Sequence, residues 1–316
     1  MSASPGAVLA EPTEQLGLHP TSCAICETPG NADELHAANL TSAAFTAAVF
    51  SARRLPDGVH YRVVRCRSCG LVRSDPVLGA EGLAKLYRVS TFEYGDELAG
   101  LRATYAKALE RLTALVPERA GLLDIGTGSG FVLELAQDNG WTGVRGVEPS
   151  EDAITRARPD IRPLIAADVM RPGLFEHGSF DAVTLFQVLD HMPDPVALLA
   201  ECREVLRPGG VALAFNHNVK AWSARLLGER SPIIDVEHTY LYSTTTIRAL
   251  FDQAGFEILS VRPVRNTYSI KYLAHLLPLP DRQKGPLLSL LGRSRLGRFE
   301  VTVPLGNLCL IARRRA

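Results

Sequence analysis

The sequence predicts a doubly wound α/β fold, and two observations carry this prediction. The first is an apolar run at 121–123 that leads into a glycine-rich turn from Asp124 to Gly130, followed by a helical pattern from Phe131. Strand, glycine turn and helix in this order open nucleotide-binding α/β domains. The second is a series of later strand-like segments that each lead into a polar or acidic residue. Such a series is typical of parallel strands whose carboxyl ends meet at one edge of a sheet.

The glycine turn predicts the kind of ligand. Its spacing is Gly-x-Gly-x-Gly, at Gly126, Gly128 and Gly130, and the strand before it ends in Asp124. Glycine permits left-handed backbone angles and lets a ligand approach the main chain closely. The carboxylate of Asp124 would repel a pyrophosphate but attract a ligand that carries an ammonium and a sulfonium. The turn therefore favours S-adenosylmethionine over a dinucleotide, with these four residues at the cofactor.

Later strand ends supply further candidate cofactor residues. Segment 143–148 is expected to be a second strand that ends in Glu148, where a carboxylate can accept both ribose hydroxyls. Asp168 and Val169 follow a short third strand, where a side chain can meet the adenine amine. Gln187 lies where a buried fourth strand runs into a loop. We expect all four residues to line the cofactor site.

The order of these elements resembles the class I S-adenosylmethionine-dependent methyltransferases over residues 96–261, about half of the chain. A helix at 195–206, an Arg-Pro-Gly-Gly turn and an apolar strand at 211–215 complete the likeness. The resemblance implies a Rossmann-like sheet of seven strands. Segments 256–265 and 307–313 are then expected to be strands six and seven, which usually pair antiparallel.

Two Cys-x-x-Cys pairs, Cys23/Cys26 and Cys66/Cys69, predict a metal site. A two-residue gap lets both thiolates of a turn point at one ion, and two such turns complete a tetrahedron. The interval between the pairs, 27–65, is longer than usual and implies an insertion. The alternatives are disulfides, an iron–sulfur cluster and free thiols. Disulfides are disfavoured because no export signal is visible, and the cysteines lack the clustered spacing of ferredoxins. We expect one structural Zn²⁺, because four thiolates leave no open position.

The stretch from Cys66 to Pro76, followed by Leu83–Tyr87, resembles zinc-ribbon-bearing methyltransferases of natural-product and sugar tailoring. These include the deoxysugar C-methyltransferases, which carry a further carboxy-terminal domain. We expect no such domain within these 316 residues. This departure weighs against C-methylation of a sugar and leaves the methyltransferase resemblance intact.

Composition is that of an ordinary globular protein, with 46% apolar and 22% charged residues and a formal net charge of zero. Neither a signal peptide nor an apolar run of membrane-spanning length is visible, so we expect a cytoplasmic protein without a membrane partner. The expected organisation is a flexible leader (1–20), a zinc-ribbon domain (21–80) and a methyltransferase domain (81–316). An insertion at 267–302 is expected to form a lid over the acceptor or the contact of a homodimer.

Two motifs that the sequence lacks argue against some classes of methyl acceptor. The sequence has neither Asn/Asp-Pro-Pro-Tyr, used to methylate base amino groups, nor the Pro-Cys nucleophile of cytosine C5 methylation. The basic carboxy-terminal tail lacks the aromatic residues among its basic ones that are typical of proteins that bind single-stranded nucleic acid. We therefore expect a small molecule or a carrier-linked small group, methylated on oxygen rather than carbon. The alternatives are a non-catalytic S-adenosylmethionine-binding scaffold whose zinc module recruits a protein, and an RNA methyltransferase.

Three histidines are candidates for proton transfer, because they follow strands four and five at the expected carboxyl edge of the sheet. Methylation of oxygen needs alignment of the two partners and benefits from a base, for which histidine is suited near neutral pH. We expect His238 to be this base, with His191 second and His217 third. Asp190 or Asp235 would orient it. Each histidine has an alternative interpretation as a structural residue of its loop.

Overall fold

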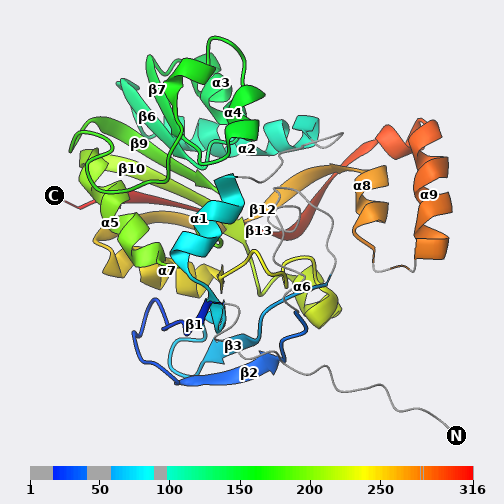
Figure 1. Ribbon diagram of the computed structural model, residues 1–316. Coiled ribbons are helices and arrows are strands. Elements are labelled where there is room, and N and C mark those ends of the chain that lie inside the picture. The colour runs from blue at the N-terminus through cyan, green and yellow to red at the C-terminus, as the bar shows by residue number, and fades with distance from the viewer. Residues whose placement is uncertain (1–16, 41–57, 89–97, 278, 280, 316) are drawn as a thin grey trace, which may run out of the picture.

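A computed structural model describes residues 17–40, 58–88, 98–277, 279 and 281–315 (Figure 1). Its centre is one mixed sheet of seven strands in the order β12-β13-β10-β9-β6-β7-β8. These strands are β6 (Gly121–Ile125), β7 (Gly143–Val147), β8 (Ile165–Ala166), β9 (Phe180–Phe186), β10 (Leu206–His217), β12 (Phe256–Ser269) and β13 (Glu300–Arg314). The predicted seven-stranded Rossmann-like sheet is confirmed.

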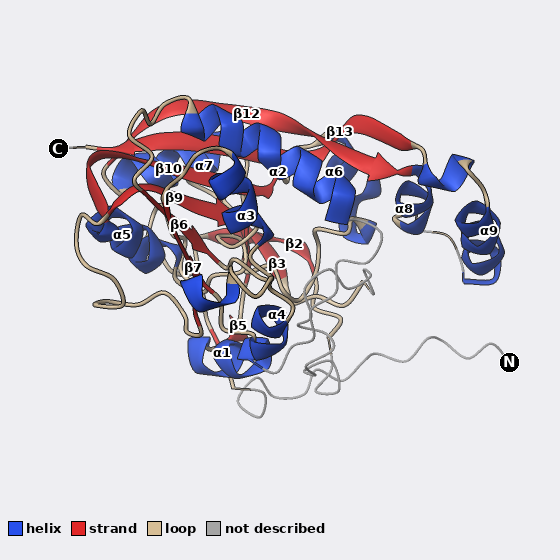
Figure 2. Cartoon of the chain, turned by 90° about the horizontal axis from the view of Figure 1, so that it is seen from above, coloured by secondary structure: helices blue, strands red, loops and turns tan. Residues whose placement is uncertain are grey.

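Helices cover both faces of this sheet (Figures 1 and 2). The helices are α1 (Ala80–Arg88), α2 (Leu98–Thr113), α3 (Phe131–Asp138), α4 (Glu151–Thr155), α5 (Pro195–Val205), α6 (Trp222–Leu227), α7 (Thr244–Gln253), α8 (Ile270–His275) and α9 (Asp281–Arg293). Helices α2 and α3 pack into one apolar core, and α5 and α7 pack into another. Alternate residues of β10 enter the two cores, with Phe215 in the first and Ala214 in the second, because successive side chains of a strand point to opposite faces.

Strands β6, β7, β8, β9 and β10 run parallel, and β13 joins β10 in the antiparallel direction. All seven residues of β9 are buried, as expected for a central strand covered on both faces. The carboxyl ends of the parallel strands therefore lie along one edge. The residues that follow β6, β7, β9 and β10 are brought together there.

The helix boundaries follow local signals in the sequence. Helix α5 begins after Asp194, whose carboxylate accepts a hydrogen bond from the Ala197 N–H, and it ends one residue before the predicted Leu206 because that residue starts β10. Ser243 caps α7 in a reciprocal capping box with Thr246.

Strands β12 and β13 pair antiparallel, as the resemblance implied, but they extend beyond the predicted segments 256–265 and 307–313. Pairing continues to Ser269 and Glu300, so both ends of the predicted insertion belong to strands. Helices α8 and α9 connect β12 to β13 in the chain, and they stand beyond the ends of these strands at one side of the molecule (Figure 1).

The amino-terminal part forms a second sheet in the order β11-β4-β3-β2, beside a short β1-β5 pair. Its strands are β1 (Leu18–His19), β2 (Ala32–His36), β3 (Val63–Cys66), β4 (Val72–Ser74), β5 (Val77–Leu78) and β11 (Tyr240–Leu241). Strand β11 follows β10 in the chain, and its Tyr240 pairs with Arg73 of β4. The two parts are thus joined by backbone pairing.

Most of the predicted leader, 1–20, lies outside the described residues. Within the part of the chain that the structure describes, none of the helices combines the length and the apolar character needed to cross a bilayer.

Candidate active site

The glycine turn between β6 and α3 has the backbone that its sequence predicts. Gly126, Gly128 and Gly130 have φ angles of 68°, 57° and 77°. A Cβ at Gly126 would lie 2.5 Å from Val188 Cγ2, and one at Gly130 would lie 2.5 Å from Ile161 Cγ2. Backbone angle and close packing both require glycine at these two positions.

Asp124, at the end of β6, is buried beside this turn and accepts a hydrogen bond of 2.6 Å from the Thr184 hydroxyl. Burial raises the pKa of Asp124 to about 7, and the nearby Glu148 carboxylate adds to the rise against the hydrogen bonds from Thr184 and Thr127. A cationic ligand would favour the ionised form of Asp124.

Glu148 follows β7 and holds the turn from the other side. One carboxylate oxygen accepts from the Gly128 N–H at 2.8 Å and the other from the Ser150 N–H at 2.9 Å. Burial raises the pKa of Glu148, and these two bonds oppose the rise. Because each carboxylate oxygen accepts about two hydrogen bonds, Glu148 keeps acceptor capacity for ribose hydroxyls.

Asp168 is half-buried and accepts from the Val169 N–H at 2.8 Å and the Arg171 guanidinium at 2.9 Å. The bond from Val169, followed by Arg171, lowers the pKa of Asp168. Gln187 has a φ of 55°, uncommon outside glycine, and its N–H donates to the Phe215 carbonyl at 2.7 Å. A non-glycine residue held in this conformation at a strand end is a feature of functional sites.

One cavity of about 530 Å³ joins these residues, within the range typical of small-molecule sites. The predicted cofactor residues on its wall are Asp124, Gly126, Glu148, Asp168, Val169 and Gln187. Gly128 and Gly130 belong to the turn but not to the wall.

The three predicted histidines line the same cavity. They come from the loop after β9 (His191), the end of β10 (His217) and the segment before β11 (His238). The ring of His238 lies 4.9 Å from that of His191 and 4.8 Å from that of His217, between ring centres. The fold thus gathers residues that are 47 positions apart (191 to 238) into one cluster.

Asp190 lies fully buried beside the histidines. Its carboxylate accepts hydrogen bonds from the side-chain amide of Asn216 at 3.1 Å and from the backbone N–H of His217 at 3.4 Å. The same carboxylate lies 3.8 Å from His191 Nε2 and 4.0 Å from His217 Nε2. Asp190 and Asp235 were the carboxylates expected to orient His238. The ion-pair distances of Asp190 are to His191 and His217, and Asp235 lines the cavity wall beside His238.

Two residues of this cluster were not predicted from the sequence. The Tyr87 hydroxyl lies 3.1 Å from His191 Nδ1, and Asn307 Oδ1 lies 3.0 Å from His217 Nδ1. Tyr87 is in α1 and Asn307 is in β13, so neither follows a parallel strand. Tyr87 ends the segment Leu83–Tyr87 that contributes to the family resemblance, but the sequence assigned no role to either residue.

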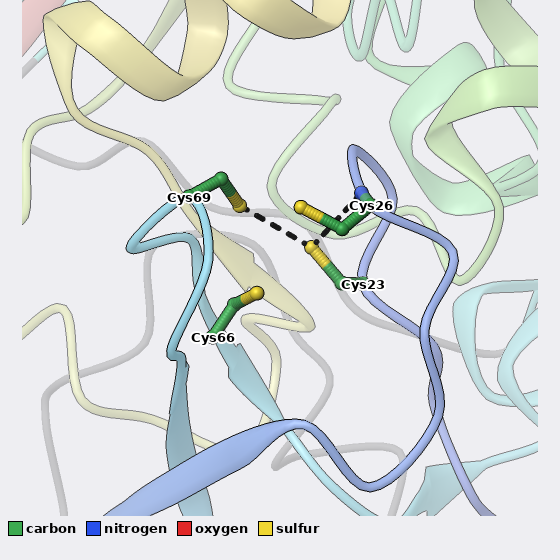
Figure 3. A group of neighbouring side chains, drawn as sticks. All are labelled: Cys23, Cys26, Cys66 and Cys69. Atoms are coloured by element: carbon green, nitrogen blue, oxygen red, sulfur yellow. Dashed lines mark hydrogen bonds between the residues drawn. The ribbon is translucent and has the colours of Figure 1, made fainter.

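Cys23, Cys26, Cys66 and Cys69 form a second cluster in which every Sγ lies within 4.8 Å of the others (Figure 3). The Cys23 and Cys69 sulfurs are 3.4 Å apart. Zn–S bonds of about 2.3 Å in a tetrahedron place sulfurs about 3.8 Å apart, so the four thiols are compatible with a zinc-ribbon site.

Residues 98–261 match the family described as methyltransferase domain. The chain belongs to this methyltransferase-domain family, as the resemblance implied.

Curated relatives agree with this assignment over part of the chain. The ubiquinone biosynthesis O-methyltransferase of Pseudomonas aeruginosa is 32% identical over 126 residues, which are 36% of this chain and 54% of that protein. The enzyme of the same name from Escherichia coli is 30% identical over 142 residues, 39% of this chain and 58% of that protein. The chain thus spans somewhat over half the length of these relatives.

Among solved structures, a methyltransferase from Bacillus halodurans, named as putative, aligns with a TM-score of 0.49 and 19% identity, covering 68% of this chain and all of that one.

Proposed function

We propose that the protein transfers the methyl group of S-adenosylmethionine to an oxygen of a small molecule or of a small group on a carrier. The observation that carries the proposal is the single cavity that joins the glycine turn and Glu148 at one end with three histidines and Asp190 at the other. The name of the curated relatives supports oxygen as the acceptor atom.

The cofactor supplies an electrophilic methyl group on a sulfonium. Asp124, the turn and Glu148 are proposed to hold it, with Asp168, Val169 and Gln187 along the adenosine side of the wall. The acceptor hydroxyl would then lie against the histidine cluster, where its proton is removed as the oxygen attacks. His238 is the first candidate for this role and His191 the second.

The four thiols are proposed to hold one Zn²⁺ in a structural role, because a complete set of four protein ligands leaves no position for substrate. Helix α8 is proposed to cover the acceptor, since Tyr272 and Leu276 line the cavity. A homodimer contact through α8 and α9 is the alternative for this segment.

A panel of phenols, aliphatic alcohols, carbon acids and amines tests the function, with labelled S-adenosylmethionine and product analysis by mass spectrometry. The expected result is a methyl ether. Tight cofactor binding without transfer to any member of the panel would instead favour the scaffold, and transfer to RNA alone would favour the RNA methyltransferase.

A further inference from the structure

We propose that Asp190, His217 and His238 bind a divalent transition-metal ion at the acceptor end of the cavity. The inference rests on the proposed oxygen methylation and changes one role within it. His238 becomes a metal ligand, and His191 becomes the residue that receives the proton.

Distances support this assignment. One ligand atom of each residue lies within 4.8 Å of the other two, and His217 Nε2 lies 4.0 Å from an Asp190 oxygen. Metal bonds of about 2.0–2.2 Å place neighbouring ligand atoms roughly 3.0–3.6 Å apart, so the ligand atoms need to approach by roughly 1 Å. Among the described residues, the four cysteines form the other group whose possible ligand atoms all lie within 4.8 Å of one another.

The charge of Asp190 supports a cation. Its side chain is fully buried, and among the described residues no lysine or arginine nitrogen lies within 4.0 Å of its carboxylate. The groups of opposite charge within reach are histidines, which are neutral unless protonated. A buried carboxylate without a fixed cation is costly, and a bound ion would supply the missing positive charge.

The hydrogen bonds around the cluster orient His217 for coordination. When His217 Nδ1–H donates to Asn307 Oδ1 at 3.0 Å, Nε2 carries the lone pair and faces the Asp190 carboxylate. Two acceptors that face each other repel unless a proton or a cation lies between them. A metal-bound histidine that donates its other N–H to an oxygen is the usual arrangement of such sites.

Two histidines and one carboxylate leave coordination positions open, as in catalytic rather than structural metal sites. His217 and His238 line the cavity, so these positions face the acceptor. An acceptor oxygen on the ion loses its proton more readily. The proton passes to His191, the oxygen lone pair forms the new C–O bond, and the electrons of the broken C–S bond remain on sulfur.

Titration with Co²⁺ tests the site without an acceptor. Protein that holds Zn²⁺ on its cysteines is titrated by calorimetry, because Co²⁺ binds more weakly than Zn²⁺ and leaves that site occupied. One equivalent of Co²⁺ is expected to bind, with visible absorption of nitrogen and oxygen ligation. Asp190→Asn and His217→Ala should each weaken binding at least tenfold. His177→Ala, at an exposed histidine beside Glu204, should leave it unchanged.

Asn307→Ala keeps all three ligands and should weaken Co²⁺ binding by about 10–100-fold. S-adenosylmethionine affinity within a few-fold of wild type shows that each variant is folded. Wild-type protein that takes up no Co²⁺, or binding unchanged in His217→Ala, would overturn the metal site and leave methyl transfer standing. Co²⁺ uptake as expected without methyl transfer to any acceptor would overturn the proposed function alone.

Discussion

The cysteine cluster and the Asp190, His217 and His238 cluster are alike in geometry and differ in how they are encoded. In both, the ligand atoms lie within 4.8 Å of one another. The cysteines come as two pairs, each within one tight turn. The other three residues come from the loop after β9 (Asp190), the end of β10 (His217) and the segment before β11 (His238), and they meet at the sheet edge.

This difference corresponds to a difference in chemistry. Four thiolates can complete a coordination sphere, so the proposed role of their cluster is structural. The histidine cluster lies on a cavity wall and leaves room for a substrate. The two clusters are also linked, because Ser74 of β4 donates a hydrogen bond of 2.8 Å to the His238 carbonyl and β11 completes the amino-terminal sheet.

The largest effect is expected from Cys66→Ser. Structural zinc contributes about 10–16 kcal/mol in small zinc domains, so losing one of four thiolates should release the ion and unfold the amino-terminal part. Because β11 would lose its partner strand, turnover should fall as well. Metal analysis and thermal unfolding measure both, and Cys202→Ala, outside the cluster, should retain about one zinc ion per chain. Iron, or no metal, in fresh anaerobic protein would contradict this prediction.

Replacing 270–299 with a short turn should abolish turnover while S-adenosylmethionine binding and zinc content survive. The replacement removes Tyr272 and Leu276 from the acceptor end of the wall, far along the chain from the glycine turn. Calorimetry, metal analysis and light scattering together give the outcome. Loss of cofactor binding together with loss of a dimer would make the segment an interface instead.

His238→Ala should lower turnover by about 10²–10⁴, the usual contribution of a residue that assists proton transfer. Cofactor affinity should stay within a few-fold, since Glu148 and the glycine turn are unchanged. Rates at saturating cofactor are compared with those of His191→Ala and of His177→Ala as the control. If His238→Ala keeps wild-type turnover and His191→Ala does not, His238 has no role in proton transfer, either as a base or as a metal ligand.

Glu148→Ala should weaken S-adenosylmethionine binding at least tenfold, because hydrogen bonds to a charged group contribute about 1.5–3 kcal/mol each. Glu148 also holds the Gly128 and Ser150 N–H groups, so part of the loss comes from a looser turn. Glu148→Gln retains an acceptor oxygen and should lose less. Glu151→Ala, at an exposed neighbour, is the matched control. An unchanged dissociation constant in the alanine variant would remove Glu148 from the site.

The smallest effect is a pH dependence of cofactor binding. The pKa of Asp124 is about 7 in the protein without cofactor, and only the ionised form attracts a cation. Affinity should therefore rise with pH through 7 and fall roughly tenfold from pH 8 to pH 6. Asp124→Asn should remove this dependence, measured by calorimetry across the range. A wild-type profile that is flat between pH 6 and pH 8 would show that Asp124 does not contact the cationic part of the ligand.

The sequence by itself determined the features that depend on near neighbours in the chain. The spacing Gly-x-Gly-x-Gly requires left-handed backbone, and the structure shows positive φ at Gly126, Gly128 and Gly130. Each Cys-x-x-Cys pair is a local signal of the same kind, and so is each apolar strand that runs into a polar residue. They were enough to predict the sheet and the thiol cluster.

Tertiary structure alone decided which distant residues meet. Tyr87 reaches His191 from α1, Asn307 reaches His217 from an antiparallel strand, and Asp190 becomes the buried centre of the histidines. These contacts depend on strand register and on how α1 packs over the sheet edge. The residues next to each of these positions in the sequence do not predict such contacts, because distant segments meet only when the whole sheet and its helices have assembled.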